Sequence, residues 1–313
     1  MKKYYLIGLL LYCCYSLVGS PYVLATKKEV VPIEISKRLI LVKAKLNKQK
    51  GYFLFDTGVS GLVLNQQHFN PHNEYNFAHA ITDISGKAAA VKHIPVKSFQ
   101  LGKLSRRNFL APQLNMDELE GMLGKKLLGL IGYQVVKAFE VIIDYDEKTL
   151  TLLDLDRDGL PSVAQLPPAD YQFEFQLCRY LPVLKVSFAN QQTLRLGLDS
   201  GSTLNLVNKS LETAFLPISR SQRTISFKGA LSEIRDANYL LMENVAIGNQ
   251  VAWRFWKAAF EDLSHMHHLN MPIDGLLGIN FFRMGKVSIN FEKQQIKVWE
   301  RVNGYESMYF SLN

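Results

Sequence analysis

The sequence predicts an all-β protein built from two homologous halves. Three observations support this fold class: short apolar runs alternate with polar residues at a period of two, one long segment occurs twice, and the same Asp-containing turn stands once in each half. The chain has 313 residues, of which 48% are hydrophobic and 20% are charged. We therefore expect a globular protein with a substantial core and exclude a disordered one.

Strand signal is concentrated in short runs rich in Val, Ile, Leu and Phe, separated by clusters of Gly, Asn and Lys. In the first half these runs cover residues 31–46, 51–55, 62–65, 91–101, 141–144 and 150–153. Helical signal is sparse, and we expect only two short helices, within residues 116–128 and 210–215.

The duplication is clearest near the end of each half. Residues 129–154 align without a gap with residues 275–300, at an offset of 146 positions. Gly129 and Gly132 of the first copy are repeated as Gly275 and Gly278 of the second. Each copy closes with a strand, a polar turn and a returning strand, so the chain is predicted to contain one structural unit twice.

The division into domains follows from this repeat. Residues 156–170 contain three prolines and form the expected linker. We expect a signal peptide at residues 1–25, an N-terminal lobe at residues 26–160 and a C-terminal lobe at residues 161–313.

The N-terminus has the pattern of an export signal. Lys2 and Lys3 precede an apolar stretch, and Ala25 offers a small residue for cleavage. We therefore expect an extracytoplasmic protein, periplasmic or secreted. Two alternatives remain open, which are association with the membrane through an uncleaved segment, and lipidation at Cys13 or Cys14.

The cysteine content and the charge exclude two properties, an intramolecular disulfide and nucleic-acid binding. Cys178 is the only cysteine after the predicted signal, so an intramolecular disulfide is excluded and the core must hold the fold. The formal net charge is +8, but no run of basic residues is interleaved with aromatic residues. No nucleic-acid partner is therefore expected.

Two triplets carry the chemistry. Asp56-Thr57-Gly58 lies in FLFDTGVSGLVLN, and Asp199-Ser200-Gly201 lies in LGLDSGSTLNLVN. An isolated triplet of this kind is usually a surface turn. Here each triplet stands between two apolar strands, and each is followed about 75 positions later by the repeated glycine segment. Each Asp is thus predicted to be a carboxylate held at the end of a strand.

Two such carboxylates brought together have a specific chemistry. Like charges a few ångströms apart cannot both ionise easily, so the pair shares one proton. The ionised member can activate a water, and the protonated member can polarise a carbonyl. The small hydroxyls of Thr57 and Ser200 are expected to bond backbone across the boundary between the halves, and Ser60 and Ser202 to orient the outer carboxylate oxygens.

These motifs resemble those of the retropepsin-like aspartyl proteases of bacteria, over residues 31–300. The resemblance implies six-stranded β-barrel lobes of the aspartic protease fold with the active site between them. It implies that Asp56 and Asp199 are catalytic and that a glycine-containing flap covers the cleft. The implied supporting and flap residues are Gly58 and Gly201 of the triplets, Ile131 with Gly132, Leu277 with Gly278, and the flap glycines Gly86 and Gly229.

The resemblance also implies an activity and an assembly. Because both triplets lie in one chain, it predicts a monomeric aspartic endopeptidase of the pepsin-like arrangement, with a polypeptide substrate and no cofactor. Three alternatives stay open: a homodimer in which a single lobe is active, a non-catalytic peptide-binding protein on the same fold, and an envelope-anchored structural protein.

A run of histidines, His265, His267 and His268, raises the question of a metal. No cysteine or carboxylate pair stands around it at ligand spacing, and Pro272 follows closely. We expect a loop here and no metal site.

Overall fold

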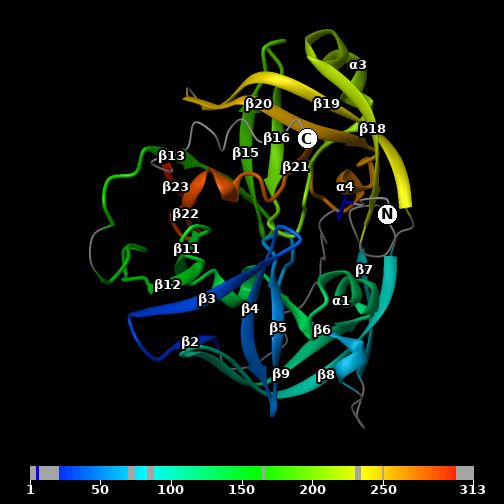
Figure 1. Ribbon diagram of the computed structural model, residues 1–313. Coiled ribbons are helices and arrows are strands. Elements are labelled where there is room, and N and C mark those ends of the chain that lie inside the picture. Colours follow the sequence, from blue (N-terminus) through cyan, green and yellow to red (C-terminus); the bar gives the residue numbers. More distant parts are fainter. Residues whose placement is uncertain are drawn as a thin grey trace.

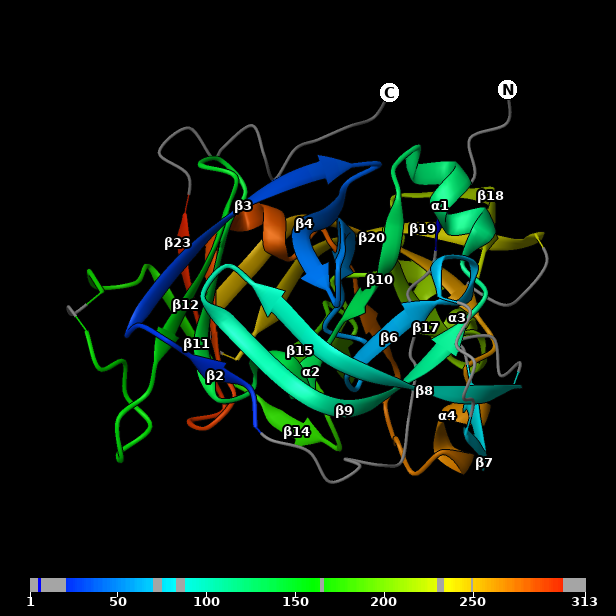
Figure 2. The same ribbon diagram turned by 90° about the horizontal axis from the view of Figure 1, so that it is seen from below.

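The all-β fold class is confirmed. The computed structural model describes residues 5–6, 21–69, 75–82, 88–163, 166–229, 234–248 and 250–300. Strands make up 57% of the structure and helices 12%, so β-structure dominates both halves. In Figure 1 the N-terminal half lies at the bottom and the C-terminal half at the top, and Figure 2 shows the first half from below.

The first half forms a closed six-stranded barrel. Its strands pair in the ring order β4-β5-β10-β6-β9-β8, and the ring closes where β4 pairs again with β8, at Lys45↔Gln100 and Leu46↔Phe99. The six barrel strands are β4 (Leu39–Leu46), β5 (Gln49–Phe55), β6 (Leu62–Asn65), β8 (Ala88–Leu101), β9 (Leu104–Leu114) and β10 (Leu127–Ile131). Outside the ring, β7 (Tyr75–Thr82) pairs with β8 and β2 (Val23–Leu24) pairs with β9.

The second half repeats this connectivity. Its ring order is β15-β16-β21-β17-β20-β19, and β15 pairs with β19 at Val186↔Ile247 and Ser187↔Ala246. The strands of this ring are β15 (Leu181–Ser187), β16 (Thr193–Leu198), β17 (Asn205–Asn208), β19 (Ile234–Ile247), β20 (Gln250–Glu261) and β21 (Gly275–Leu277). Outside the ring, β14 (Gln176–Cys178) pairs with β15, β18 (Ser221–Lys228) pairs with β19, and β1 (Tyr5–Leu6) pairs with β18.

A further set of strands joins the halves, and Figure 1 shows it at the left of the molecule. The two strands that meet are β11 (Phe139–Asp144) and β22 (Gly285–Asn290), which pair antiparallel. They are flanked by β3 (Lys28–Ser36) and β12 (Thr149–Asp154) on one side, and by β13 (Tyr171–Glu174) and β23 (Gln295–Glu300) on the other. The repeated segments of the sequence therefore pair with each other.

Polar side chains cross this junction as well. The buried carboxylate of Glu140, on β11, accepts a hydrogen bond from the Asn290 amide at 2.6 Å and another from the Ser288 hydroxyl, both on β22. At the other end of β11, Asp144 forms an ion pair with Lys286 at 3.1 Å. A buried carboxylate without partners would be destabilising, so these contacts fix the two halves in register.

The helices are short. They are α1 (Asp117–Leu123), α2 (Tyr133–Val136), α3 (Glu212–Phe215), α4 (His265–His268) and the 3₁₀ helices η1 (Gln66–His68), η2 (Lys209–Leu211), η3 (Leu216–Ile218) and η4 (Phe282–Met284). Among the described residues, no helix has the length and apolar character needed to cross a membrane. The helix expected within residues 210–215 is present as η2 and α3.

Two expected segments are present with different bounds. The helix expected within residues 116–128 is α1, which ends at Leu123 because Gly124 takes a left-handed conformation (φ 62°) and caps it. Leu127 and Leu128 then belong to β10. The strand-rich run at residues 31–46 divides into β3 and β4 at a turn, in which Lys37 and Arg38 have φ of 51° and 73°.

Candidate active site

The two triplets lie at the ends of corresponding strands. Asp56 follows β5 and Asp199 follows β16, and these strand ends meet between the two halves (Figure 1). The Asp56 amide donates to the Ile131 carbonyl at 2.9 Å, and the Asp199 amide donates to the Leu277 carbonyl at 2.8 Å. Ile131, the last residue of β10, thus bonds the start of the first loop, and Leu277, the last residue of β21, bonds the start of the second. Both belong to the predicted supporting segments.

The glycines of these segments allow a close approach of backbone to backbone. A Cβ atom on Gly132 would lie 2.0 Å from the Val59 carbonyl oxygen, and one on Gly278 would lie 2.3 Å from the Leu204 carbonyl oxygen. The segments also bond the loops directly: the Gly132 amide donates to the Gly61 carbonyl at 3.0 Å. Only glycine fits at these two positions, which explains why both copies of the repeat have it.

Thr57 and Ser200 connect the two loops. The Thr57 hydroxyl donates to the Leu198 carbonyl at 2.8 Å and accepts from the Ser200 amide at 2.9 Å. The Ser200 hydroxyl donates to the Phe55 carbonyl at 2.9 Å and accepts from the Thr57 amide at 3.0 Å. Both side chains are buried, so four hydrogen bonds without competition from water join the halves at the site.

The aspartates themselves are fully buried. Their Oδ1 atoms accept hydrogen bonds from backbone amides, Asp56 from Gly58 at 2.8 Å and Asp199 from Gly201 at 2.9 Å. Each glycine also touches the opposite carboxylate: a Cβ on Gly58 would lie 2.7 Å from Asp199 Oδ1, and one on Gly201 would lie 2.2 Å from Asp56 Oδ2. The two carboxyl groups therefore meet across the boundary between the halves.

The Oδ2 atoms of the two aspartates have no donor among the described residues. Asp56 Oδ2 and Asp199 Oδ2 are both buried, and neither accepts a hydrogen bond from any residue in the part of the chain that the structure describes. An ionised oxygen in this state is unfavourable, because burial removes its hydration without replacing it. One proton held by the pair relieves this, since it neutralises one group and supplies a donor to the other.

The pKa directions agree with a shared proton. Burial raises the pKa of Asp56 well above its usual range, and the charge of Asp199 raises it further, while the Gly58 and Gly201 amides lower it in part. Burial also raises the pKa of Asp199 to about 6, against the opposing effects of its contact with Asp56 and of the Gly201 and Ser202 amides. The two groups titrate as a pair.

The other predicted site residues are two serines of the candidate catalytic loops and the two flap glycines. Ser60 is buried in the first loop, where its carbonyl accepts from the Gln134 amide at 3.0 Å. The Ser202 hydroxyl donates to the Leu204 carbonyl at 2.8 Å, so it does not donate to a carboxylate as expected. Gly229 directly follows β18 and is buried. Gly86 lies outside the described residues.

One residue near the aspartates was not predicted from the sequence. Tyr180, just before β15, is buried, and its pKa is raised well above the usual range by burial and then by the charges of Asp56 and Asp199. It stands near neither triplet in the sequence, and only the fold brings it close to both aspartates. Lys228, next to the predicted flap glycine Gly229, forms an ion pair with Glu118 of α1 and so connects the second half to the first.

No cluster of three or more metal-ligating side chains is found among the described residues. The histidine run forms α4 rather than the expected loop. Comparison with known proteins gives no assignment, because no protein-family model matches the chain and no curated protein matches it.

Proposed function

We propose that the protein is an aspartic endopeptidase, in which a water activated between Asp56 and Asp199 hydrolyses peptide bonds. The observation that supports this best is the buried pair of carboxyl groups, one from each half, whose Oδ2 atoms lack a donor among the described residues. Their raised pKa values keep one proton on the pair into weakly acidic solution. A pair with one proton has both the base and the acid that hydrolysis requires.

The proposed reaction uses the two carboxyl groups in different roles. The ionised member accepts a proton from the water as the water attacks the peptide carbonyl carbon. The protonated member donates a hydrogen bond, and then its proton, to the carbonyl oxygen, which gives a tetrahedral diol. The carboxyl group that took the proton from water then gives it to the amide nitrogen, and the C–N bond breaks. The other carboxylate takes a proton from a diol hydroxyl, which leaves an acid, an amine and a pair that again holds one proton. The Gly58 and Gly201 amides hold the Oδ1 atoms in place, and the Thr57–Ser200 hydrogen bonds fix the distance between the loops. Such fixed positioning lowers the barrier to reaction.

The proposed substrate is an extended polypeptide lying between the halves. The strand β18 contacts the first half, where Lys228 at its end forms an ion pair with Glu118, and β18 pairs antiparallel with β19. The proposed flap residues are Gly229, which directly follows β18, and Gly86, which stands between β7 and β8 in the sequence. A peptide bound in this way adds a strand, because main-chain hydrogen bonds supply affinity and side-chain pockets supply selectivity.

The same proposal includes the assembly and the family. Both aspartates come from one chain, which supports a monomer rather than a homodimer of single lobes. We assign the chain by its motifs to the retropepsin-like family in a duplicated, two-lobed form, with lobes at residues 26–160 and 161–313. Export through the signal at residues 1–25 is part of this proposal.

Digestion of casein, an unstructured protein, tests the activity. The chain from Thr26 onward is incubated with casein from acid to neutral pH, with and without an inhibitor that mimics the transition state of aspartic proteases. Asp56→Asn is compared with Asp158→Asn, a control in an exposed turn. Cleavage that is lost with the inhibitor and in Asp56→Asn, but kept in Asp158→Asn, supports the proposal. An inactive wild type that binds extended peptides would instead favour a non-catalytic peptide-binding protein.

A further inference from the structure

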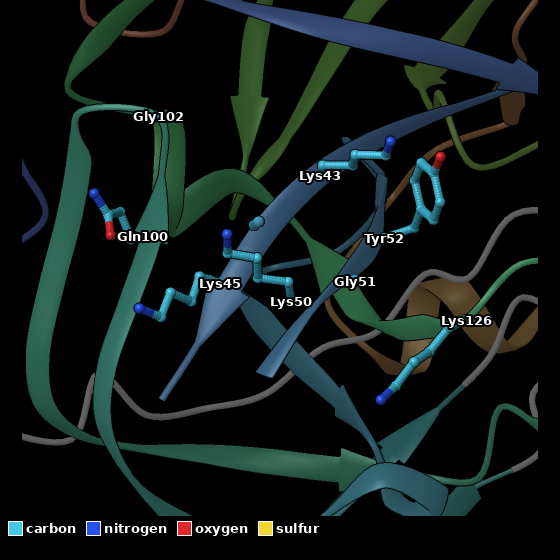
Figure 3. A pocket seen from close by; sticks show the side chains of 9 residues that line it. Lys43, Lys45, Lys50, Gly51, Tyr52, Gln100, Gly102 and Lys126 are labelled. Carbon is cyan, nitrogen blue, oxygen red and sulfur yellow. The ribbon is translucent and has the colours of Figure 1, made fainter. Parts of the chain in front are cut away.

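A hollow of about 540 Å³ lies on the first barrel, away from the aspartates. It is lined by four lysines, Lys43, Lys45, Lys50 and Lys126, together with uncharged residues from β4, β5 and β8 (Figure 3). Lys50 stands near the start of β5, and Asp56 follows the end of that strand. The β5 residues of the hollow, Lys50 to Tyr52, lie four to six residues before Asp56, which at about 3.3 Å per residue is roughly 13–20 Å along the strand.

The positive charge around the hollow is not balanced locally. Among the described residues, none of these four lysines forms an ion pair with a carboxylate. The Lys126 amine donates to the Gln49 side chain at 3.2 Å, and the Lys43 amine lies 5.2 Å from the centre of the Tyr52 ring. The excess charge is therefore available to a ligand.

Two acids lie nearby and do not remove this excess. Glu34 is bound by Lys125 at 2.7 Å and by the Tyr52 hydroxyl at 2.6 Å. Glu29 packs beside Gly102 at the rim, where a Cβ on that glycine would lie 2.1 Å from its Oε1 atom. Four lysines against two acids leave a net positive hollow.

Two of these lysines repel each other and so lower the stability of the fold. Lys45 on β4 stands directly opposite Lys50 on β5, and like charges in this relation destabilise a sheet. The duplicated half shows that the barrel does not need them. At the corresponding position, six residues before Asp199 as Lys50 is six before Asp56, Thr193 stands opposite Ser187, and their hydroxyls lie 3.0 Å apart.

We propose that this hollow binds a multivalent phosphate-bearing anion. Lysine binds phosphate as a compact point charge, and four lysines together suit an anion that carries several charges. Its volume lies within the range of small-ligand sites. A bound polyanion would offset the repulsion between Lys45 and Lys50. The inference is independent of the proposed protease activity.

Transplanting the neutral pair of the second half into the first provides the test. The variant Lys45→Ser/Lys50→Thr copies an arrangement that this fold already contains, and it is expected to fold with a Tm equal to or above that of the wild type. The control, Lys185→Gln/Lys209→Gln, removes two exposed lysines from the second half. Both variants lose the same net charge, so any difference between them reports on the hollow.

The first readout is the affinity for sodium tripolyphosphate, which isothermal titration calorimetry measures at low salt. The wild type and the control should bind alike, and the transplanted variant about tenfold or more weaker. Vesicles of phosphatidylglycerol and of phosphatidylcholine form a second arm. Selective binding to phosphatidylglycerol vesicles that the transplant abolishes would identify a lipid phosphate as the source. Binding of tripolyphosphate alone would identify a soluble one.

Three results would overturn the proposal. The first is a wild type that binds neither tripolyphosphate nor phosphatidylglycerol vesicles. The second is a control variant that weakens binding as much as the transplanted variant, which would show that only net charge matters. The third is citrate binding as tight as that of tripolyphosphate, which would contradict the assignment to phosphate.

Discussion

Thr57 and Ser200 form a reciprocal pair across the two halves, because the hydroxyl of each accepts a hydrogen bond from the backbone amide of the other, at 2.9 and 3.0 Å. Each hydroxyl also donates to a carbonyl of the opposite half. The residues stand 143 positions apart, yet together they fix the loops that present Asp56 and Asp199. Loss of either hydroxyl would leave two backbone groups of the opposite loop without partners.

Thr57→Val tests this relationship. The substitution keeps the shape of the side chain but leaves the Leu198 carbonyl and the Ser200 amide unpaired, so we expect the free energy of unfolding to fall by about 2–3 kcal/mol. Urea unfolding measures the loss. Thr57→Ser keeps the hydroxyl and is expected to stay close to the wild type. A loss in Thr57→Ser with none in Thr57→Val would show that packing of the methyl group, and not the hydrogen bonds, stabilises the junction.

Gly201→Ala tests the close approach of each loop to the opposite carboxylate. The new Cβ would lie 2.2 Å from Asp56 Oδ2, so the carboxyl groups must separate and we expect casein cleavage to fall by at least about a hundredfold. Gly121→Ala is the matched control, because nothing lies within 4 Å of that position in α1. Cleavage by Gly201→Ala at the wild-type rate would mean that the loops adjust freely.

The raised pKa values predict how stability depends on pH. Asp199 has a pKa of about 6 in the folded chain against 3.8 ordinarily, so between these values the folded chain holds a proton that the unfolded chain has released. This contribution to stability is fully present below pH 3.8 and is lost as pH rises through about 6.

Unfolding of the wild type and Asp199→Asn across this range measures the effect. From about pH 4 to about pH 6.5, the stability of the wild type should fall relative to the variant by on the order of 1–3 kcal/mol. The variant has no carboxyl group at this position and loses that dependence. If the free energy of unfolding changed with pH in the same way for the wild type and for Asp199→Asn, a protonated pair would be contradicted.

Much of the fold and of the candidate site was predictable from local pattern. Alternating apolar residues predicted a protein rich in strands, and the duplicated glycine segment predicted that the two halves share one connectivity. The small hydroxyls of Thr57 and Ser200 predicted bonds to backbone across the boundary, which the structure contains. These features depend on residue type and spacing within a few positions.

Other features depend on pairing between distant segments and were not predictable. Closure of the first barrel requires β4 to meet β8, about fifty residues later, at a register that no local pattern specifies. Leu127 and Leu128 follow a run of good helix formers, yet pairing with β5 makes them part of a strand. Tyr180, which directly precedes β15, interacts with the charges of both aspartates only because the fold brings these distant segments together.

Mixing two variants tests whether Asp56 and Asp199 of one chain form a single catalytic pair. Casein cleavage is measured for the wild type, for Asp56→Asn, for Asp199→Asn and for an equimolar mixture of the two variants. We expect cleavage by the wild type and essentially none by either variant or by the mixture, because every variant molecule lacks one member of its pair. Recovery of activity in the mixture, or wild-type cleavage by Asp199→Asn, would contradict this expectation and place the active site between two chains.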